Sequence, residues 1–212
     1  LPGVGQNLQD HLQARPIFKT NLSTINTEVK SWIRKTMMGI EYALRRTGPM
    51  TMAASLGAGF LKTHPDLETP DIQFHIQPFS ANNAVEGTHP FSAFTASVLQ
   101  LRPESKGCLK LKSADSMVYP AICPNYLATT KDQTTIVKGI QIARKIASFD
   151  PLKSHITEEY APGRDIAFDD EAGILEWARN TSVTIYHPTG TCKMGNDPMS
   201  VVDDRLQVHG IK

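Results

Sequence analysis

The residue best suited to proton chemistry in this sequence is a histidine followed at once by proline. His187 ends the β-branched run 183–185 and precedes Pro188. Proline holds the residue before it in extended geometry and carries no N–H, so the chain turns there into a loop of small residues. Such a loop lets a flat ligand approach the backbone, and the N–H groups of Gly190 and Thr191 can face it. An imidazole with an ordinary pKa of about 6.5 suits a general base, although a lone histidine beside a turn is more often structural.

The elements that must position this loop follow from hydrophobic periodicity. Apolar residues at helical spacing predict a helix over 27–46, with Met37 facing the core, and a second over 131–148, with Ile140 facing inward. The expected elements are strands over 14–20, 50–62, 71–77, 93–101 and 107–112, helices over 27–46, 131–148 and 169–180, and an extended segment over 201–208. This order predicts an α+β fold, a largely antiparallel sheet with helices packed on one face.

Composition excludes several classes of protein. Lys and Arg number 22 against 21 Asp and Glu, so no electrostatic case exists for nucleic acid. No apolar run is long enough for a transmembrane segment.

Cys108, Cys123 and Cys192 are scattered and predict free thiols in a reducing compartment. His75 and His89 have no partners at metal-ligand spacing, so no metal is expected. We expect a cytoplasmic protein, and peripheral attachment to a membrane stays open.

The segment 186–195 resembles the active-site histidine motif of the glucose–methanol–choline (GMC) flavoprotein oxidoreductases, His-Pro-x-Gly-Thr-x-x-Met-Gly. The matching residues are His187, Pro188, Gly190, Thr191, Met194 and Gly195. Segment 3–11 is similar to the family's Gly-Val-Gly-x-Asn-Leu-x-Asp-His, which lies where the flavin domain hands over to the substrate domain. Within it, Asp10 and His11 are expected to form a local capping pair that fixes the turn. The likeness is greatest to the choline-dehydrogenase-like branch.

The resemblance implies an FAD-dependent alcohol oxidoreductase that transfers hydride from a primary alcohol to flavin N5. It implies His187 as the base and Asn7, Gly190 and Thr191 as cofactor-binding residues. Its partners would be a small-molecule alcohol and an electron acceptor, quinone or oxygen. Residues 1–13 would end a segment of the FAD domain. Residues 14–180 would form the substrate-binding domain, and residues 181–212 would return to the FAD domain with the histidine loop.

Two features keep an alternative open. No dinucleotide-binding βαβ unit is visible in the sequence, and the family's second catalytic His or Asn would lie beyond Lys212. We therefore expect a fragment of a longer chain, and the alternative is a non-catalytic or truncated module without a complete flavin site. A hydrolase is less favoured because no Gly-x-Ser-x-Gly motif occurs. Choline itself is not favoured, since residues 50–62 hold no carboxylate and Phe60 is their only ring.

Overall fold

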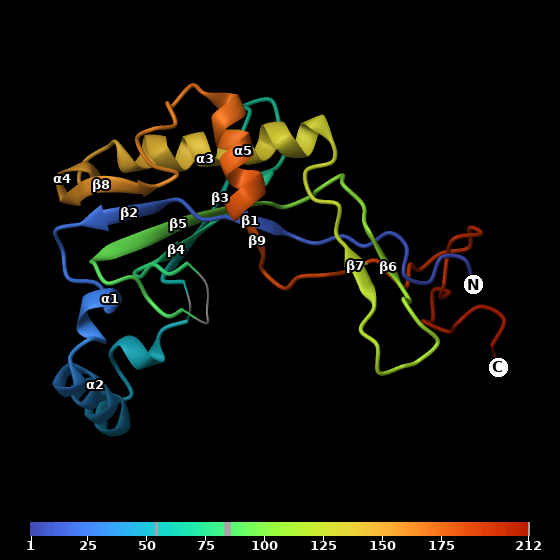
Figure 1. Ribbon diagram of the computed structural model, residues 1–212, viewed down its shortest axis with the longest axis horizontal. Coiled ribbons are helices and arrows are strands. Elements are labelled where there is room, and N and C mark those ends of the chain that lie inside the picture. Colours follow the sequence, from blue (N-terminus) through green and yellow to red (C-terminus); the bar gives the residue numbers. More distant parts are fainter. Residues whose placement is uncertain (54, 83–85, 212) are drawn as a thin grey trace. The chain divides into compact units, whose positions relative to one another are not determined.

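The computed structural model describes residues 1–53, 55–82 and 86–211, and the chain forms two units (Figure 1). Unit 1 comprises Leu1–Leu12, Arg102–Thr134 and Val183–Lys212, and unit 2 comprises Gln13–Leu101 and Thr135–Ser182. Ala54, inside the expected strand over 50–62, lies outside the described residues, as does Lys212. Each unit therefore draws on segments that are far apart in the sequence.

Unit 2 is built around an antiparallel sheet in which the long central strand β5 pairs with β1, β2 and β4. The strands are β1 (Leu12–Ala14), β2 (Ile17–Thr20), β3 (Gly57–Leu61), β4 (Ile72–Gln77), β5 (Ala93–Gln100) and β8 (Ile156–Ala161). The strand predicted over 71–77 forms as β4, in which Ile72 and Phe74 are buried but Ile76, on the same face, is 38% exposed. The strand expected over 14–20 is split at Pro16 into β1 and β2, since proline cannot donate to a ladder.

Helix α3 (Thr130–Ala147) supplies much of the core of unit 2. The predicted inward residue Ile140 is buried, as are Ile136, Ala143 and Ala147. A Cβ on Gly139 would lie 2.7 Å from a methyl group of Val98 in β5, so the helix packs closely on the sheet at this point. The short helix α4 (Leu152–His155) leads into β8, and α5 (Glu171–Thr181) buries Ile174 and Ala178. The predicted mixture of helices and antiparallel sheet is confirmed.

The region after β2 differs from the prediction. In place of the helix expected over 27–46 there are two helices, α1 (Ile25–Glu28) and α2 (Trp32–Arg45). Ser31 lies between them and caps the N-terminus of α2. Met37 was expected in the core but is 58% exposed, and α2 buries no residue. Among the described residues of the strand expected over 50–62, only β3 is a strand, and it follows the 3-10 turn η1 (Pro49–Thr51).

Unit 1 consists mostly of loops joined by short β-contacts. Its regular strands are β6 (Cys108–Lys110), β7 (Ala121–Cys123) and β9 (Val183–Thr184), and β6 and β7 form a two-stranded ribbon. β7 was not predicted. The segment 201–208 makes only isolated bridges in the described structure. No helix in the described ranges is both long and apolar enough to cross a membrane.

Candidate active site

The carboxylate of Asp10 joins three distant segments of unit 1. It accepts hydrogen bonds from the hydroxyl of Tyr126, from Thr184 Oγ1 at 2.5 Å and from the backbone N–H of His187 at 3.0 Å. The last bond holds the residue directly before Pro188, three positions after the end of β9. Asp10 therefore fixes a turn 177 residues away, in addition to accepting a local bond from the His11 N–H.

The same bonds set the acidity of the groups involved. Burial raises the pKa of the Asp10 carboxyl, but the hydrogen bonds from Thr184, Tyr126 and the N–H groups of His11 and His187 outweigh it, so the pKa lies below its ordinary value. Burial, and then donation to Asp10, raises the pKa of Tyr126 to about 12. Near neutral pH the carboxylate is thus ionised and the phenol keeps its proton.

The imidazole of His187 is held at Nδ1. Its Nδ1 lies 3.3 Å from Nδ1 of His11, and the two rings meet edge to face at 63°. The backbone of the same segment is held by a bond from the Ile185 N–H to the His11 carbonyl at 3.3 Å. Among the described residues none pairs with Nε2 of His187, and the side chain is exposed. The ring is therefore oriented through Nδ1, while Nε2 stays accessible to a ligand.

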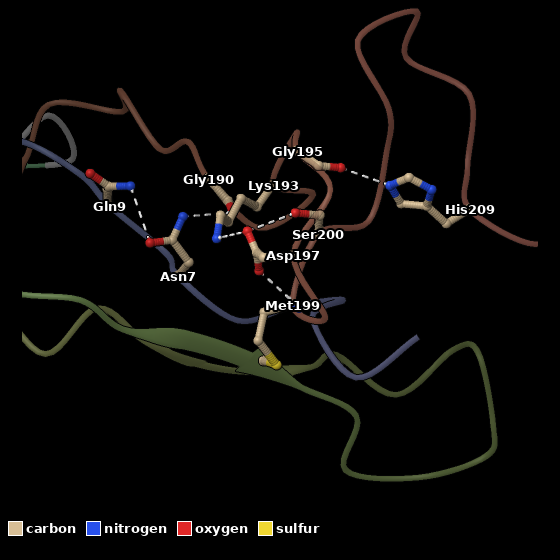
Figure 2. Close-up of polar contacts among 9 residues, drawn as sticks. All are labelled: Asn7, Gln9, Gly190, Lys193, Gly195, Asp197, Met199, Ser200 and His209. Carbon is tan, nitrogen blue, oxygen red and sulfur yellow. Dashed lines mark hydrogen bonds and ion pairs between the residues drawn. The ribbon is translucent and has the colours of Figure 1, made fainter.

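The loop after Pro188 lies against the N-terminal segment (Figure 2). Asn7 Nδ2 donates to the Gly190 carbonyl at 3.1 Å, and Gln9 and Thr189 exchange backbone hydrogen bonds of 2.9 and 2.8 Å. Gly190 has φ +92°, and a Cβ there would lie 2.4 Å from the carbonyl oxygen of Asn7. Only glycine fits this position. Within the described part of the chain, the N–H groups of Gly190 and Thr191 donate to no protein acceptor.

The far end of this loop is tied down by its own polar contacts (Figure 2). Asp197 accepts from Lys193 Nζ at 2.6 Å and from Ser200 Oγ at 2.9 Å, and these bonds lower the pKa of Asp197 to about 2. The ring of His209 bonds the Gly195 carbonyl at 2.9 Å. Both ends of the loop are thus fixed within unit 1.

The structure brings all four predicted site residues, Asn7, His187, Gly190 and Thr191, into unit 1. Sequence reasoning missed Tyr126 and Thr184. Tyr126 belongs to the segment 124–127, and Thr184 lies in the β-branched run before the histidine, but neither position reveals a partner 116 or 174 residues away. In the described ranges no group of three potential ligands could hold a metal ion.

Comparison with known proteins assigns the family. Residues 103–212 match the family model described as GMC oxidoreductase. The whole chain is 38% identical to an alcohol dehydrogenase [acceptor] of Pseudomonas putida and 36% identical to an oxygen-dependent choline dehydrogenase of Proteus mirabilis (strain HI4320). The chain belongs to the GMC oxidoreductase family. It spans 38% of the length of each of these two GMC relatives.

Solved structures share the fold of this GMC chain. A formate oxidase of Aspergillus oryzae RIB40 superposes with a TM-score of 0.87 at 22% identity, over 99% of this chain and 41% of that one. Pyridoxine 4-oxidase from Mesorbium loti gives a TM-score of 0.77 at 21% identity, over 100% of this chain and 37% of that one. At such identities the likeness concerns the fold alone.

The loop residues fit a flavin cofactor unequally. Gly190 and Thr191 have no side chain or a small one, and their N–H groups are unoccupied, which suits an acceptor edge of a flat ring. The Asn7 side chain is already engaged, because Nδ2 donates to Gly190 and Oδ1 accepts from Gln9 at 3.4 Å. Asn7 therefore suits holding the loop better than holding a ligand.

Proposed function

We propose that this chain carries the catalytic base of an FAD-dependent alcohol oxidoreductase, with His187 as that base. One observation carries the proposal. His187 is fixed through Nδ1 and through its backbone N–H, and its Nε2 is open and exposed. A general base needs this arrangement, since it must be oriented and still reach the substrate proton.

In this mechanism Nε2 of His187 removes the hydroxyl proton of a primary alcohol, which makes the α-carbon a better hydride donor. Nε2 must be unprotonated for this step, so the proton of the neutral ring sits on Nδ1 and is donated to Nδ1 of His11. Once the ring is protonated, both nitrogens carry hydrogen, and the bond to His11 persists. Asp10 keeps the ring in place by holding the backbone of its residue.

FAD, when bound, supplies the hydride acceptor. Gly190 and Thr191 would donate their N–H groups to it, and Asn7 would hold the loop in the required shape. The domain organisation belongs to the same proposal: segments 1–13 and 181–212 join the FAD domain, and 14–180 form the substrate domain. The electron acceptor in this proposal is quinone or oxygen.

The test is to replace His187 with Ala in the complete enzyme and to follow flavin reduction by a primary alcohol anaerobically in a stopped-flow instrument. A general base contributes about 10²–10⁴ in rate, so we expect a loss of that size. The flavin absorbance of the purified variant should match the wild type, because His187 is not assigned to cofactor binding.

A matched control is His64→Ala, which removes an exposed histidine of unit 2. It should reduce flavin at the wild-type rate. Unchanged reduction in the His187 variant would remove this residue from the mechanism, whereas loss of bound flavin would assign it to the cofactor site.

A further inference from the structure

Two of the three cysteines face each other across the ribbon of unit 1. Cys108 in β6 and Cys123 in β7 are paired positions of the antiparallel register. Both are free thiols in the structure, as is Cys192. In the sequence they are 15 positions apart with no motif between them, so only the pairing of the strands reveals their proximity.

The hydrogen bonding of the ribbon fixes the kind of pair they form. The N–H of Leu109 donates to the Gly5 carbonyl at 2.6 Å and therefore points away from β7. Successive pairs of an antiparallel ladder alternate, so Leu109 and Ile122 form a non-hydrogen-bonded pair, and Cys108 and Cys123 form a hydrogen-bonded one. The Cα atoms of such a pair are about 5.5 Å apart, within the range of about 4.4–6.8 Å that a disulfide spans.

The two thiols also differ in access. Cys123 is exposed and Cys108 half-buried. The connection between the strands is open, with Leu111 and Tyr119 85% and 87% exposed. An oxidant can therefore reach Cys123 first, and Cys108 lies across the ribbon as the resolving thiol.

We propose that Cys108 and Cys123 form a reversible cross-strand disulfide when the protein meets a peroxide. The Cys123 thiolate attacks one oxygen of hydrogen peroxide, the O–O bond breaks, and a sulfenic acid forms. The departing hydroxide takes up the proton that the thiol released and becomes the first water. The Cys108 thiolate then attacks that sulfur, the S–S bond forms, and hydroxide leaves to become the second water. Two thiols lose two electrons and two protons, and one peroxide becomes two waters. Exposed disulfides of this kind are readily reduced again by thiols.

The experiment uses the complete protein and hydrogen peroxide at a few equivalents. The remaining thiols are alkylated, the protein is digested with trypsin without reduction, and the peptide masses are measured by mass spectrometry. Cleavage after Lys112 separates the two cysteines, so their peptides stay together only through a disulfide. We expect the joined peptide, two hydrogens lighter than its parts, with Cys192 alkylated. Dithiothreitol should abolish the joined peptide.

Two variants keep the test decisive. Cys108→Ser should replace the joined peptide by a sulfenic acid on Cys123 that dimedone traps. The double change Cys123→Ser and Ile122→Cys moves the thiol by one residue to the opposite face of the ribbon and should give no joined peptide. The proposal is overturned if the double variant crosslinks equally, if Cys123 pairs with Cys192, or if Cys123 proves unreactive toward peroxide.

Discussion

The sequence holds three His-Pro steps, at His64, His89 and His187. Two of them, His89 in unit 2 and His187 in unit 1, lead to opposite environments. In unit 2, His89 is only 7% exposed, and both ring nitrogens are engaged, Nδ1 at 3.0 Å from Ser80 Oγ and Nε2 at 2.8 Å from Asn82 Oδ1. Its ring also stacks on Phe91 at 5.0 Å. In unit 1, His187 is exposed, and one nitrogen has no protein partner in the described structure.

The difference separates a structural histidine from one that can exchange protons. Burial lowers the pKa of His89, Glu86 raises it and Arg15 lowers it, with a net shift downward, so the neutral ring is favoured. A ring that is buried, neutral and bonded at both nitrogens has no proton to exchange with a substrate. The dipeptide sets the backbone turn in both places, and the surrounding partners decide the role.

The largest loss of stability should come from a substitution at Gly190, in the loop that follows His187. Gly190→Ala places a Cβ 2.4 Å from the Asn7 carbonyl at φ +92°, and we expect a loss of about 3 kcal/mol in unfolding free energy. Urea titration measures it. Gly210→Ala is the matched control, because its φ is +73° but nothing lies within 4 Å of the added Cβ. It should cost about 1 kcal/mol. Equal losses would show that the contact with Asn7 is unimportant.

A smaller effect is expected at the carboxylate that holds His187. In Asp10, Oδ2 accepts from Tyr126 and Thr184, and Oδ1 accepts from the His187 N–H. Asp10→Asn turns one of these two oxygens into an NH₂ donor and should cost about 2 kcal/mol. Flavin reduction in the complete enzyme should slow by about tenfold or more, because the base loses its orientation. In contrast, Asp197→Asn removes a carboxylate at the exposed end of the same loop and should leave the rate unchanged.

The pH dependence of stability tests the same assignment. Since the folded pKa of Asp10 lies below its ordinary 3.8, the ionised group stabilises the fold above that pH, and this contribution is lost as the pH falls through the folded pKa. The Asn variant should therefore lose less stability than the wild type between pH 5 and pH 3. A parallel loss in both proteins would argue against the Asp10 bonds.

The smallest effect is expected at the buried histidine, His89. His89→Phe keeps the stack on Phe91 but cannot be protonated. Because the folded pKa of His89 is lowered, its neutral form stabilises the fold above the unfolded pKa, and stability falls as the pH drops below about 6.5. Between pH 7.5 and 5.5 the wild type should lose up to about 1 kcal/mol per pH unit more than the variant. Urea midpoints at the two pH values test this. Flavin reduction at pH 7.5 should be unaffected.

The sequence predicted the periodic elements best. The helical spacing of α3 and the alternation of β4 are local patterns. The structure buries Ile140 and Phe74, which these patterns indicate, while Ile76 near the end of β4 is exposed. The same reasoning was wrong for Met37 in α2. An amphipathic pattern shows that a helix has an apolar face, but it does not show which surface, if any, covers that face.

The polar partners of the site could not be predicted in the same way. His187, Gly190 and Thr191 were found because they are adjacent in one motif. Tyr126 and Thr184 meet Asp10 only through the course of the chain between them, which no local pattern encodes. The pairing of Cys108 with Cys123 was missed for the same reason, since β7 is too short for its period to stand out.

The bond between Asp10 and Thr184 has a consequence for how the protein is made. The two residues are 174 positions apart. At a synthesis rate of about 5–20 residues per second, Thr184 is added to the growing chain roughly 10–35 seconds after Asp10. Until then the ribosome holds a chain whose Asp10 carboxylate lacks the donors from β9 and the histidine loop. The corner that carries His187 is therefore among the last parts of this segment able to form, and ribosome-bound chains that end before residue 184 should expose the N-terminal segment to chaperones and proteases.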